Sequence, residues 1–439
     1  MLFNRINHWM RRLSGEASAR NHRPDVEMVG ISAQLERLEK KIDEALYGVE
    51  LLRKRSSVYV GHGVALTQLL DDSPMYVNSN DFGGPATLLN GGIYEPENLE
   101  IIFSFIRDDS IFIDVGANLG FFSLMVARRV YSHGKVHAFE PNPEMARLIL
   151  GSAYINGFAD LLPNDASTIV VHPCGAGDTP GECEFWIPAD HAGGGVQVSQ
   201  NGQQSGRIFS AQIKRLDDVF EDSFVCDFVK IDVEGHEINV LRGMERIIAR
   251  SKEIKILFEK LGRNIGNETE LESFFADREL TLYAIEADAR LRHLNLGELA
   301  EHDGYVLATQ DVADLEECTR SRFCIYPRQL RTVPSTFKEI SRQRFHAVGA
   351  KGSLLFHGPY WLLRAGIYEF EIVGVVIGVV RFSIAGRFGH EHSNALLSNQ
   401  NMKMIVIIER DLLNFECIAK AETAAAEIFV DEIIVKKIG

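Results

Sequence analysis

The stretch that decides the fold is FIDVGANLGFFSLMVARRV, which runs from residue 112 to residue 130. A short apolar run ends at Asp114, and Gly116, Asn118 and Gly120 follow before a second, longer apolar run begins. Glycine adopts backbone angles that other residues avoid, and it lets the backbone come close to a ligand. The stretch therefore predicts a buried strand, a tight glycine turn and a helix, in that order.

A second predicted strand, KVHAFEP, carries Glu140 at its end, twenty residues beyond Gly120 (140 − 120 = 20). In dinucleotide-binding folds, a carboxylate at this position accepts the hydroxyls of a ribose. The chain matches neither G-x-G-x-x-G nor G-x-x-x-x-G-K-[ST], so neither a pyrophosphate nor a triphosphate is favoured. S-adenosylmethionine, which bears adenosine without a pyrophosphate, fits best, and Asp114 would bond its ammonium group through water or the backbone. The alternative is a purely structural turn.

Strands and helices alternate from about Tyr59 to Arg331, as in TIVVHPCG, FVKIDVEG and EIKILFEK with the helical runs between them. This alternation predicts a Rossmann-like α/β region over 59–331, with a parallel, doubly wound sheet whose ligands bind beyond the carboxyl ends of the strands. The glycine-rich stretch PADHAGGGVQVSQNGQQSG interrupts the pattern. We expect it to form a hairpin or a mobile loop, and such loops often cover a site.

Four ordered motifs resemble those of the FkbM-type S-adenosylmethionine-dependent methyltransferases. They are GIYEPENLEIIFSFIRDDSIFIDVGANLGFFSLMVAR, VHAFEPNPEMARLI, IKRLDDVF and FVKIDVEGHEINVLRGM, and together they cover roughly Tyr94 to Pro327. The resemblance implies a class I methyltransferase fold, S-adenosylmethionine as cofactor and, usually, O-methylation of a sugar or natural-product hydroxyl. The matching positions are Glu95, Asp114, Gly116, Asn118, Gly120, Glu140, Asp232, Glu234 and Gly235. The resemblance therefore implies that six of these residues bind the cofactor, namely Glu95, Asp114, Gly116, Asn118, Gly120 and Glu140.

The motif KIDVEGHE places Asp232, Glu234 and His236 within five residues at the end of a predicted strand. A hydroxyl must lose its proton when it is methylated, so a base is expected there. In an extended chain Asp232 and Glu234 point to the same side. We rank Asp232 first for a catalytic or substrate-orienting role, then Glu234, then His236 beside the next helix. The alternatives are a capping role for Glu234 and Glu237, a surface position for His236, and a divalent metal for which no third ligand is identifiable. Glu259 would line the acceptor pocket or form a buried salt bridge.

Two helical segments precede the α/β region. Residues 1–20 form an amphipathic segment with arginines beside an apolar stripe, which would lie on an anionic membrane surface or pack on the protein itself. Residues 25–55 carry apolar positions spaced alternately by three and four, the pattern of a coiled coil. We expect this helix to pair subunits into a homo-oligomer, and packing against the chain's own body is the alternative.

Residues 335–439 are rich in strand-like runs without helical spacers, and they predict an antiparallel β-sandwich. FHGPYWLLRAGIYEFEI is similar to the start of small β-sandwich modules attached to bacterial polysaccharide-assembly enzymes. Tyr360, Trp361 and Tyr368 would either stack on sugar rings or fill the core.

The composition narrows the function classes. Asp and Glu exceed Lys and Arg by 61 to 46, so the formal net charge is −15 and nucleic acid is an unlikely general partner. There is no convincing secretory signal, and the longest apolar run, Ile372–Val380, is far short of the roughly 20 residues of a spanning helix. We therefore expect a cytoplasmic enzyme, in contact with the inner membrane face if residues 1–20 bind it.

The sequence thus predicts an O-methyltransferase that acts on a sugar hydroxyl in a cell-surface polysaccharide or a lipid-linked glycan. Two alternatives remain open: a non-catalytic glycan-binding scaffold, and an O-methyltransferase of a small natural product or lipid.

Overall fold

The structure is a computed structural model of the whole chain. It describes residues 57–69, 73–81, 84–130, 134–159, 168–188, 196–197, 206–260, 268–286, 289–310, 322–325, 330, 332, 335–340, 344–363, 365–386, 390–409 and 412–438. The predicted amphipathic segment 1–20 and the coiled-coil helix 25–55 lie outside the described residues. None of the described helices is both long and apolar enough to cross a membrane.

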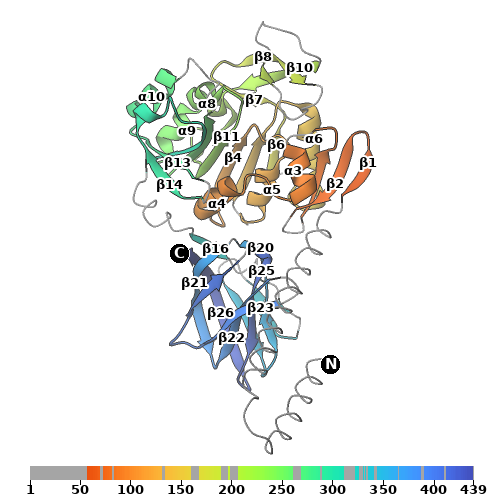
Figure 1. Cartoon of the computed structure of the whole chain (residues 1–439), viewed down its shortest axis with the longest axis vertical. Helices are drawn as coiled ribbons and strands as arrows, with labels where there is room; N and C mark the ends of the chain where they lie inside the picture. Colours follow the sequence, from red (N-terminus) through yellow and green to blue (C-terminus); the bar gives the residue numbers. More distant parts are fainter. Residues whose placement is uncertain are drawn as a thin grey trace, which may run out of the picture. The chain divides into compact units, whose positions relative to one another are not determined.

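The central element of the α/β region is an eight-stranded sheet with the order β14-β13-β15-β12-β11-β4-β5-β6 (Figure 1). Five strands from β6 to β12 run parallel, as the alternating pattern predicts. β15 lies antiparallel between β12 and β13, so the complete sheet is mixed. The strands are β4 (Ile111–Val115), β5 (Lys135–Phe139), β6 (Ile169–His172), β11 (Phe228–Ile231), β12 (Lys255–Lys260), β13 (Thr281–Ile285), β14 (Leu291–Leu294) and β15 (Gly304–Thr309).

Helices cover both faces of this sheet because its strands are apolar on both sides. On β4, Phe112 belongs to one hydrophobic cluster and Ile113 to the other, as the two-residue period of a strand requires. Helices α3 to α6 contribute to the Phe112 cluster, and α7 to α10 contribute to the Ile113 cluster. The helices are α3 (Gly84–Gly91), α4 (Pro96–Phe105), α5 (Phe121–Ala127), α6 (Pro143–Ile155), α7 (Leu216–Val219), α8 (Glu237–Arg242), α9 (Glu245–Arg250), α10 (Glu268–Asp277) and the 3-10 helix η2 (Leu296–Glu298).

Two small sheets accompany the central one. The first contains β1 (Val58–Gly61), β2 (Val64–Gln68) and β3 (Pro74–Asn78). The second contains β7 (Gly175–Ala176), β8 (Gly181–Pro188), β9 (Val196–Gln197) and β10 (Gly206–Lys214). β8 and β10 pair antiparallel over their whole length, so the glycine-rich stretch between them joins the two strands of a hairpin, one of the two forms predicted for it.

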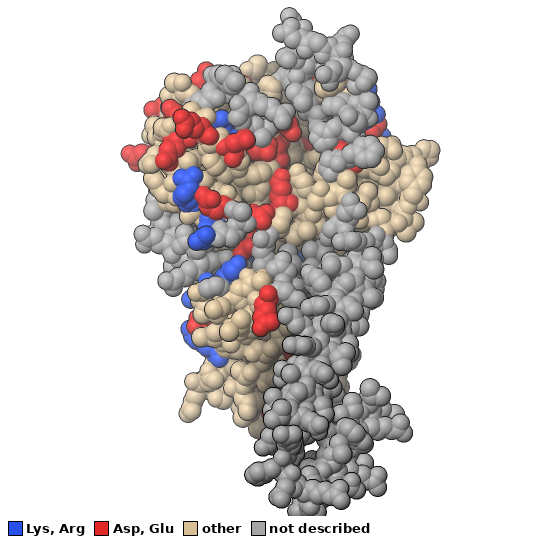
Figure 2. Space-filling view, viewed as in Figure 1, with Lys and Arg blue, Asp and Glu red and all other residues tan. Residues whose placement is uncertain are grey.

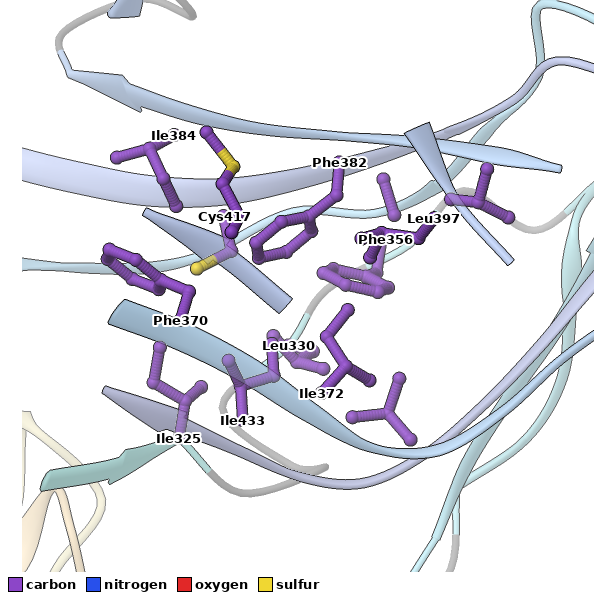
Figure 3. Close-up of a cluster of buried hydrophobic side chains, with 14 of the residues drawn as sticks. Ile325, Leu330, Phe356, Phe370, Ile372, Phe382, Ile384, Leu397, Cys417 and Ile433 are labelled. Carbon is purple, nitrogen blue, oxygen red and sulfur yellow. The ribbon is translucent and has the colours of Figure 1, made fainter. Parts of the chain in front are cut away.

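The C-terminal region consists of two antiparallel sheets, one of six strands and one of five. Phe370 and Ile372 on one sheet face Phe382 and Cys417 on the other, and all four belong to one buried cluster (Figure 3). The strands are β16 (Arg322–Ile325), β17 (Phe337–Ile340), β18 (Phe345–Gly349), β19 (Leu354–Phe356), β20 (Pro359–Leu363), β21 (Gly366–Ile377), β22 (Val380–Gly386), β23 (His390–Leu397), β24 (Lys403–Ile408), β25 (Leu412–Ala421) and β26 (Ala426–Lys437).

One detail differs from the sequence-based expectations for this region. β16 pairs with β26, so residues 322–325 join the C-terminal sheets, although we predicted the α/β region to extend to residue 331. Tyr368 is only 2% exposed and belongs to the core, which is one of the two alternatives predicted for it. The side chains of Tyr360 and Trp361 lie outside the described residues.

Candidate active site

A cavity of about 680 Å³ opens beside the carboxyl ends of β4, β5, β11 and β12. This is the edge at which parallel α/β sheets bind their ligands. Sequence analysis predicted six cofactor-binding residues and three catalytic ones, and seven of these nine line the cavity. The seven are Glu95, Gly116, Asn118, Glu140, Asp232, Glu234 and His236. Asp114 and Gly120 are not among the residues that line it.

Gly116 is required by the protein's own backbone. Its φ is +75°, and a Cβ atom at this position would lie 1.9 Å from the backbone oxygen of Asp232. The N–H group of Asp232 in turn donates to the carbonyl of Val115 at 3.0 Å, which joins the ends of β4 and β11. The positive φ is the one expected of a glycine at this turn, and the residue lines the cavity, so the approach of a ligand to its backbone stays a prediction.

Glu140 holds the glycine turn together from the next strand. Its Oε2 accepts the N–H of Asn118 at 2.8 Å, and its Oε1 accepts the N–H of Asn142 at 2.8 Å. Burial raises the pKa of Glu140 to about 8, although the N–H groups of Asn142 and Asn118 act in the opposite direction. Each oxygen of a carboxylate can accept two hydrogen bonds, and each oxygen of Glu140 accepts one of the two bonds described here. Both oxygens can therefore accept a further hydrogen bond from a ribose hydroxyl.

The start of α6 fixes the position of Glu140 relative to the cavity. Asn142 caps this helix, with its Oδ1 accepting the N–H of Glu144 at 3.0 Å, and Pro143 occupies the first turn. Proline suits this position because its φ is already helical and its missing N–H would have no partner there. The AFEPNP motif thus ends a strand, orients a carboxylate and begins a helix within six residues.

Asp114 and Gly120 lie beneath the turn and away from the cavity. Asp114 is 1% exposed, and its Oδ2 accepts the hydroxyl of Ser123 at 2.6 Å. Burial raises the pKa of Asp114, and the ammonium group of Lys230 opposes that rise. A Cβ at Gly120 would lie 2.9 Å from the side chain of Ile149. Neither residue offers a direct contact to a ligand, so the predicted contact of Asp114 would have to be indirect.

Asp232 belongs to a network of buried and partly buried polar groups at the carboxyl end of β11 and the amino end of β15. Its Oδ2 accepts the Nζ of Lys230 at 2.9 Å and the hydroxyl of Tyr305 at 3.1 Å. The same hydroxyl lies 3.1 Å from Oε1 of Glu95, whose Oε2 accepts the amide of Asn98 at 2.9 Å. The single phenolic proton serves only one of the two carboxylates at a time. Donation to one therefore leaves the other available to a ligand.

Lys230 provides the positive charge that keeps this network together. It is only 2% exposed. Burial disfavours its charged form, but the carboxylates of Asp232, Asp114 and Glu95 outweigh burial and raise the pKa of Lys230. A buried ion pair of this kind is costly to break, because the remaining partner stays charged and unpaired.

The turn after β11 carries the remaining predicted residues. β11 ends at Ile231, and Glu234 has a φ of +52°, so the side-by-side arrangement expected for an extended strand does not apply. Asp232 and Glu234 still reach the same cavity. His236 lines the cavity at the residue before α8, as predicted, and its side chain does not cap that helix. Glu237 accepts the N–H of Gly235 at 3.0 Å, which supports the structural role considered for it.

Glu259 on β12 lines the cavity next to Asp232 and Glu234, which is one of the two positions predicted for it. Burial raises the pKa of Glu259 to about 8, and the charges of Asp232, Glu234 and Glu95 add to the rise, while Lys230 opposes it. Among the described residues, no group of three or more His, Cys, Asp or Glu side chains is arranged to hold a metal ion.

Sequence reasoning missed Lys230, Tyr305 and Tyr94, all of which take part in the site or line it. For Lys230 a signal exists, because a lysine in the apolar run FVKID is unusual in a central strand. For Tyr305 none exists. It comes from β15, seventy-three residues after Asp232, and only the strand order brings the two together.

Comparison with known proteins agrees with this geometry. Residues 114–303 match the model of the methyltransferase FkbM domain. The chain is 27% identical over 152 residues to the hexuronic acid methyltransferase AglP of Haloferax volcanii, which covers 34% of this chain and 56% of that protein. It is 27% identical over 158 residues to methyltransferase 1 of Beauveria bassiana, which covers 31% of this chain and 59% of that protein. The chain thus spans somewhat over half the length of these curated relatives.

A crystal structure of methyltransferase FkbM from Methylobacillus flagellatus KT is similar with 18% identity and a TM-score of 0.30, covering 46% of this chain and 44% of that one. The family match and the curated relatives confirm the enzyme class for this part of the chain. Residues 114–303 are an FkbM-type domain of the S-adenosylmethionine-dependent methyltransferases.

Proposed function

We propose that the chain transfers a methyl group from S-adenosylmethionine to a hydroxyl of a sugar. The observation that carries the proposal is the cavity, in which Gly116, Asn118 and Glu140 meet Asp232 at the carboxyl edge of the sheet. The relative from Haloferax volcanii, named a hexuronic acid methyltransferase, supports a sugar as acceptor at the level of the family. A cell-surface polysaccharide or a lipid-linked glycan is the acceptor that we propose.

The residues present fit the cofactor. A carboxylate at Glu140 with free acceptor capacity suits the ribose, and the cavity of about 680 Å³ is large enough for a nucleoside and an acceptor group. The oxygens of Glu95 and Asp232 suit an ammonium group. When bound, S-adenosylmethionine supplies a methyl group on a positively charged sulfur, which is already activated for transfer.

The chain's own residues would then position the acceptor and take its proton. Holding two reacting groups at the right distance and angle can contribute roughly 7–11 kcal/mol. Asp232 is fixed by Lys230 and Tyr305, which suits it to orient the acceptor hydroxyl. Glu259 is suited to accept the proton, because a base works best when its pKa lies close to the working pH. Glu234 and His236 line the same cavity and remain candidates for either role.

Incubation of the full chain with labelled S-adenosylmethionine and cell-envelope glycans tests the proposal directly. We expect label in methylated sugars after hydrolysis, identified by mass spectrometry. A glycan-binding scaffold would take up no donor in calorimetry. An enzyme for a small natural product or lipid would bind the donor and leave the glycans unlabelled. Pairing of subunits through residues 25–55 and membrane contact through residues 1–20 stay predictions, because both segments lie outside the described residues.

A further inference from the structure

Acidic side chains predominate among the ionisable residues that line the cavity. Seven carboxylates line it, and the described lining residues include neither a lysine nor an arginine. On the face shown in Figure 2, Asp and Glu side chains also form a band across the α/β region. The seven are Glu95, Glu140, Asp178, Glu182, Asp232, Glu234 and Glu259.

Three cationic side chains on or next to the elements that line the cavity are engaged by other protein groups. Lys230 is buried and contacts Asp232 at 2.9 Å, so its charge is compensated within the network. Arg215 donates to the backbone oxygens of Asp178 at 3.0 Å and of Arg242 at 3.1 Å. Arg207 pairs with Glu144, and its NH1 lies 2.6 Å from that carboxylate. None of these three side chains is set up to receive an anionic ligand.

The end of the cavity beside β11 and β12 is the most crowded with negative charge. Asp232, Glu234 and Glu259 lie there, and Glu95 and the hydroxyls of Tyr94 and Tyr305 face the same space. The pKa of Glu259 is raised by burial and then by Asp232, Glu234 and Glu95. Ionising Glu259 therefore costs free energy, because it adds a negative charge beside those already present. A second anion brought in by an acceptor would meet the same repulsion, in a partly desolvated site that screens it poorly.

We infer that the sugar residue methylated in this cavity carries no negative charge, so that neutral sugars are accepted. Uronic acids and phosphorylated sugars are excluded by Glu95, Asp232 and Glu234, whose negative charges exceed the single positive charge of Lys230. This inference rests on the proposed function and gives its acceptor class. The acidic lining attracts the positively charged donor, and the sulfonium of the donor offsets part of the negative charge of the lining.

A glycan pool with both kinds of sugar tests the inference. The full chain is incubated with labelled S-adenosylmethionine and a pool of neutral and uronic-acid glycans, and a parallel sample has its uronic acid carboxyls chemically reduced to alcohols. After hydrolysis, mass spectrometry assigns the label to neutral or acidic residues. We expect label on neutral residues at least about tenfold above acidic ones, a factor that corresponds to 1.4 kcal/mol.

Charge variants and salt identify the cause of the preference. Glu234→Gln should lower the ratio of label on neutral residues to label on acidic residues. Glu221→Gln removes an exposed carboxylate that does not line the cavity, and it should leave this ratio unchanged. If the cavity variant loses activity, wild-type protein assayed at higher ionic strength tests the same cause. Salt screens the repulsion between the cavity and an anionic sugar, so it should lower the ratio of label on neutral residues to label on acidic residues.

Preferential labelling of uronic acid or phosphorylated residues would overturn the inference, and so would a ratio that responds to neither the cavity variant nor salt. Label in no sugar at all, from protein shown by calorimetry to bind the donor, would instead remove the proposed function, and the inference with it.

Discussion

Replacing Gly116 with alanine tests why the turn contains a glycine. The new Cβ would lie 1.9 Å from the backbone oxygen of Asp232, at a φ of +75°. A non-glycine residue in the left-handed region costs about 1–2 kcal/mol. Forcing an extra carbon into a packed site costs about 1–3 kcal/mol more. The smaller entropy of the unfolded chain with alanine offsets about 0.4–1 kcal/mol of these costs. We therefore expect Gly116→Ala to lower the free energy of unfolding by about 1–4.5 kcal/mol.

Gly157 provides a matched control. Its φ is +74°, and a Cβ at this position would have no atom within 4 Å. Gly157→Ala therefore carries the left-handed cost without the collision, and the smaller entropy of the unfolded chain offsets about 0.4–1 kcal/mol of that cost. We expect a loss of at most about 1.5 kcal/mol.

Urea denaturation of both variants, followed by circular dichroism, measures the difference. The reasoning requires Gly116→Ala to be less stable than Gly157→Ala by at least about 1 kcal/mol. It also requires weaker donor binding in Gly116→Ala, because the collision displaces the end of β11 that carries Asp232. Equal losses of stability in the two variants would show that only φ matters and that the contact between β4 and β11 is unimportant.

Three further predictions concern the polar network. Tyr305→Phe should lower the free energy of unfolding by about 0.5–1.5 kcal/mol in urea, because one hydrogen bond from β15 is lost; an unchanged midpoint would argue against the network. Asp232→Asn should reduce the rate of transfer about 10²–10⁴-fold while calorimetry still detects donor binding, and a normal rate would remove Asp232 from the reaction. Glu140 and Glu259 have pKa values raised to about 8, so their contribution to stability is present at low pH and is lost as the pH rises through 8. The donor-free protein should therefore lose stability between about pH 5 and 9, and Glu140→Gln should flatten that curve; a curve of unchanged slope would contradict the assignment for Glu140.

The parts of the fold that depend on local patterns could be predicted from the sequence. Strand, turn, helix and strand follow one another within residues 111–140, so the positions of Gly116 and Glu140 were accessible from spacing alone. The parallel order of the five central strands also follows, because helices separate most of them and parallel strands need such crossovers.

Features that depend on distant parts of the chain could not be predicted. β15 lies antiparallel between β12 and β13, and nothing in its own residues reveals that position or the contact of Tyr305 with Asp232. Glu234 illustrates a second limit. The apolar run before it predicts a strand, but the left-handed turn at Glu234 and Gly235 ends the strand earlier and changes the direction of the side chain. The raised pKa of Glu259 likewise arises from burial and then from carboxylates on two other segments, the turn after β11 and the residue before α4.

The most direct test of the account is a calorimetric titration of the full chain with S-adenosylmethionine. The account holds that Glu140 binds the ribose of this donor, so the wild-type protein should bind it and Glu140→Ala should bind it at least about tenfold more weakly. Glu144→Ala is the control, since Glu144 lies four residues further on, pairs with Arg207 and does not line the cavity. Equal affinities for wild type and a folded Glu140→Ala, or no heat of binding in the wild type, would contradict the account.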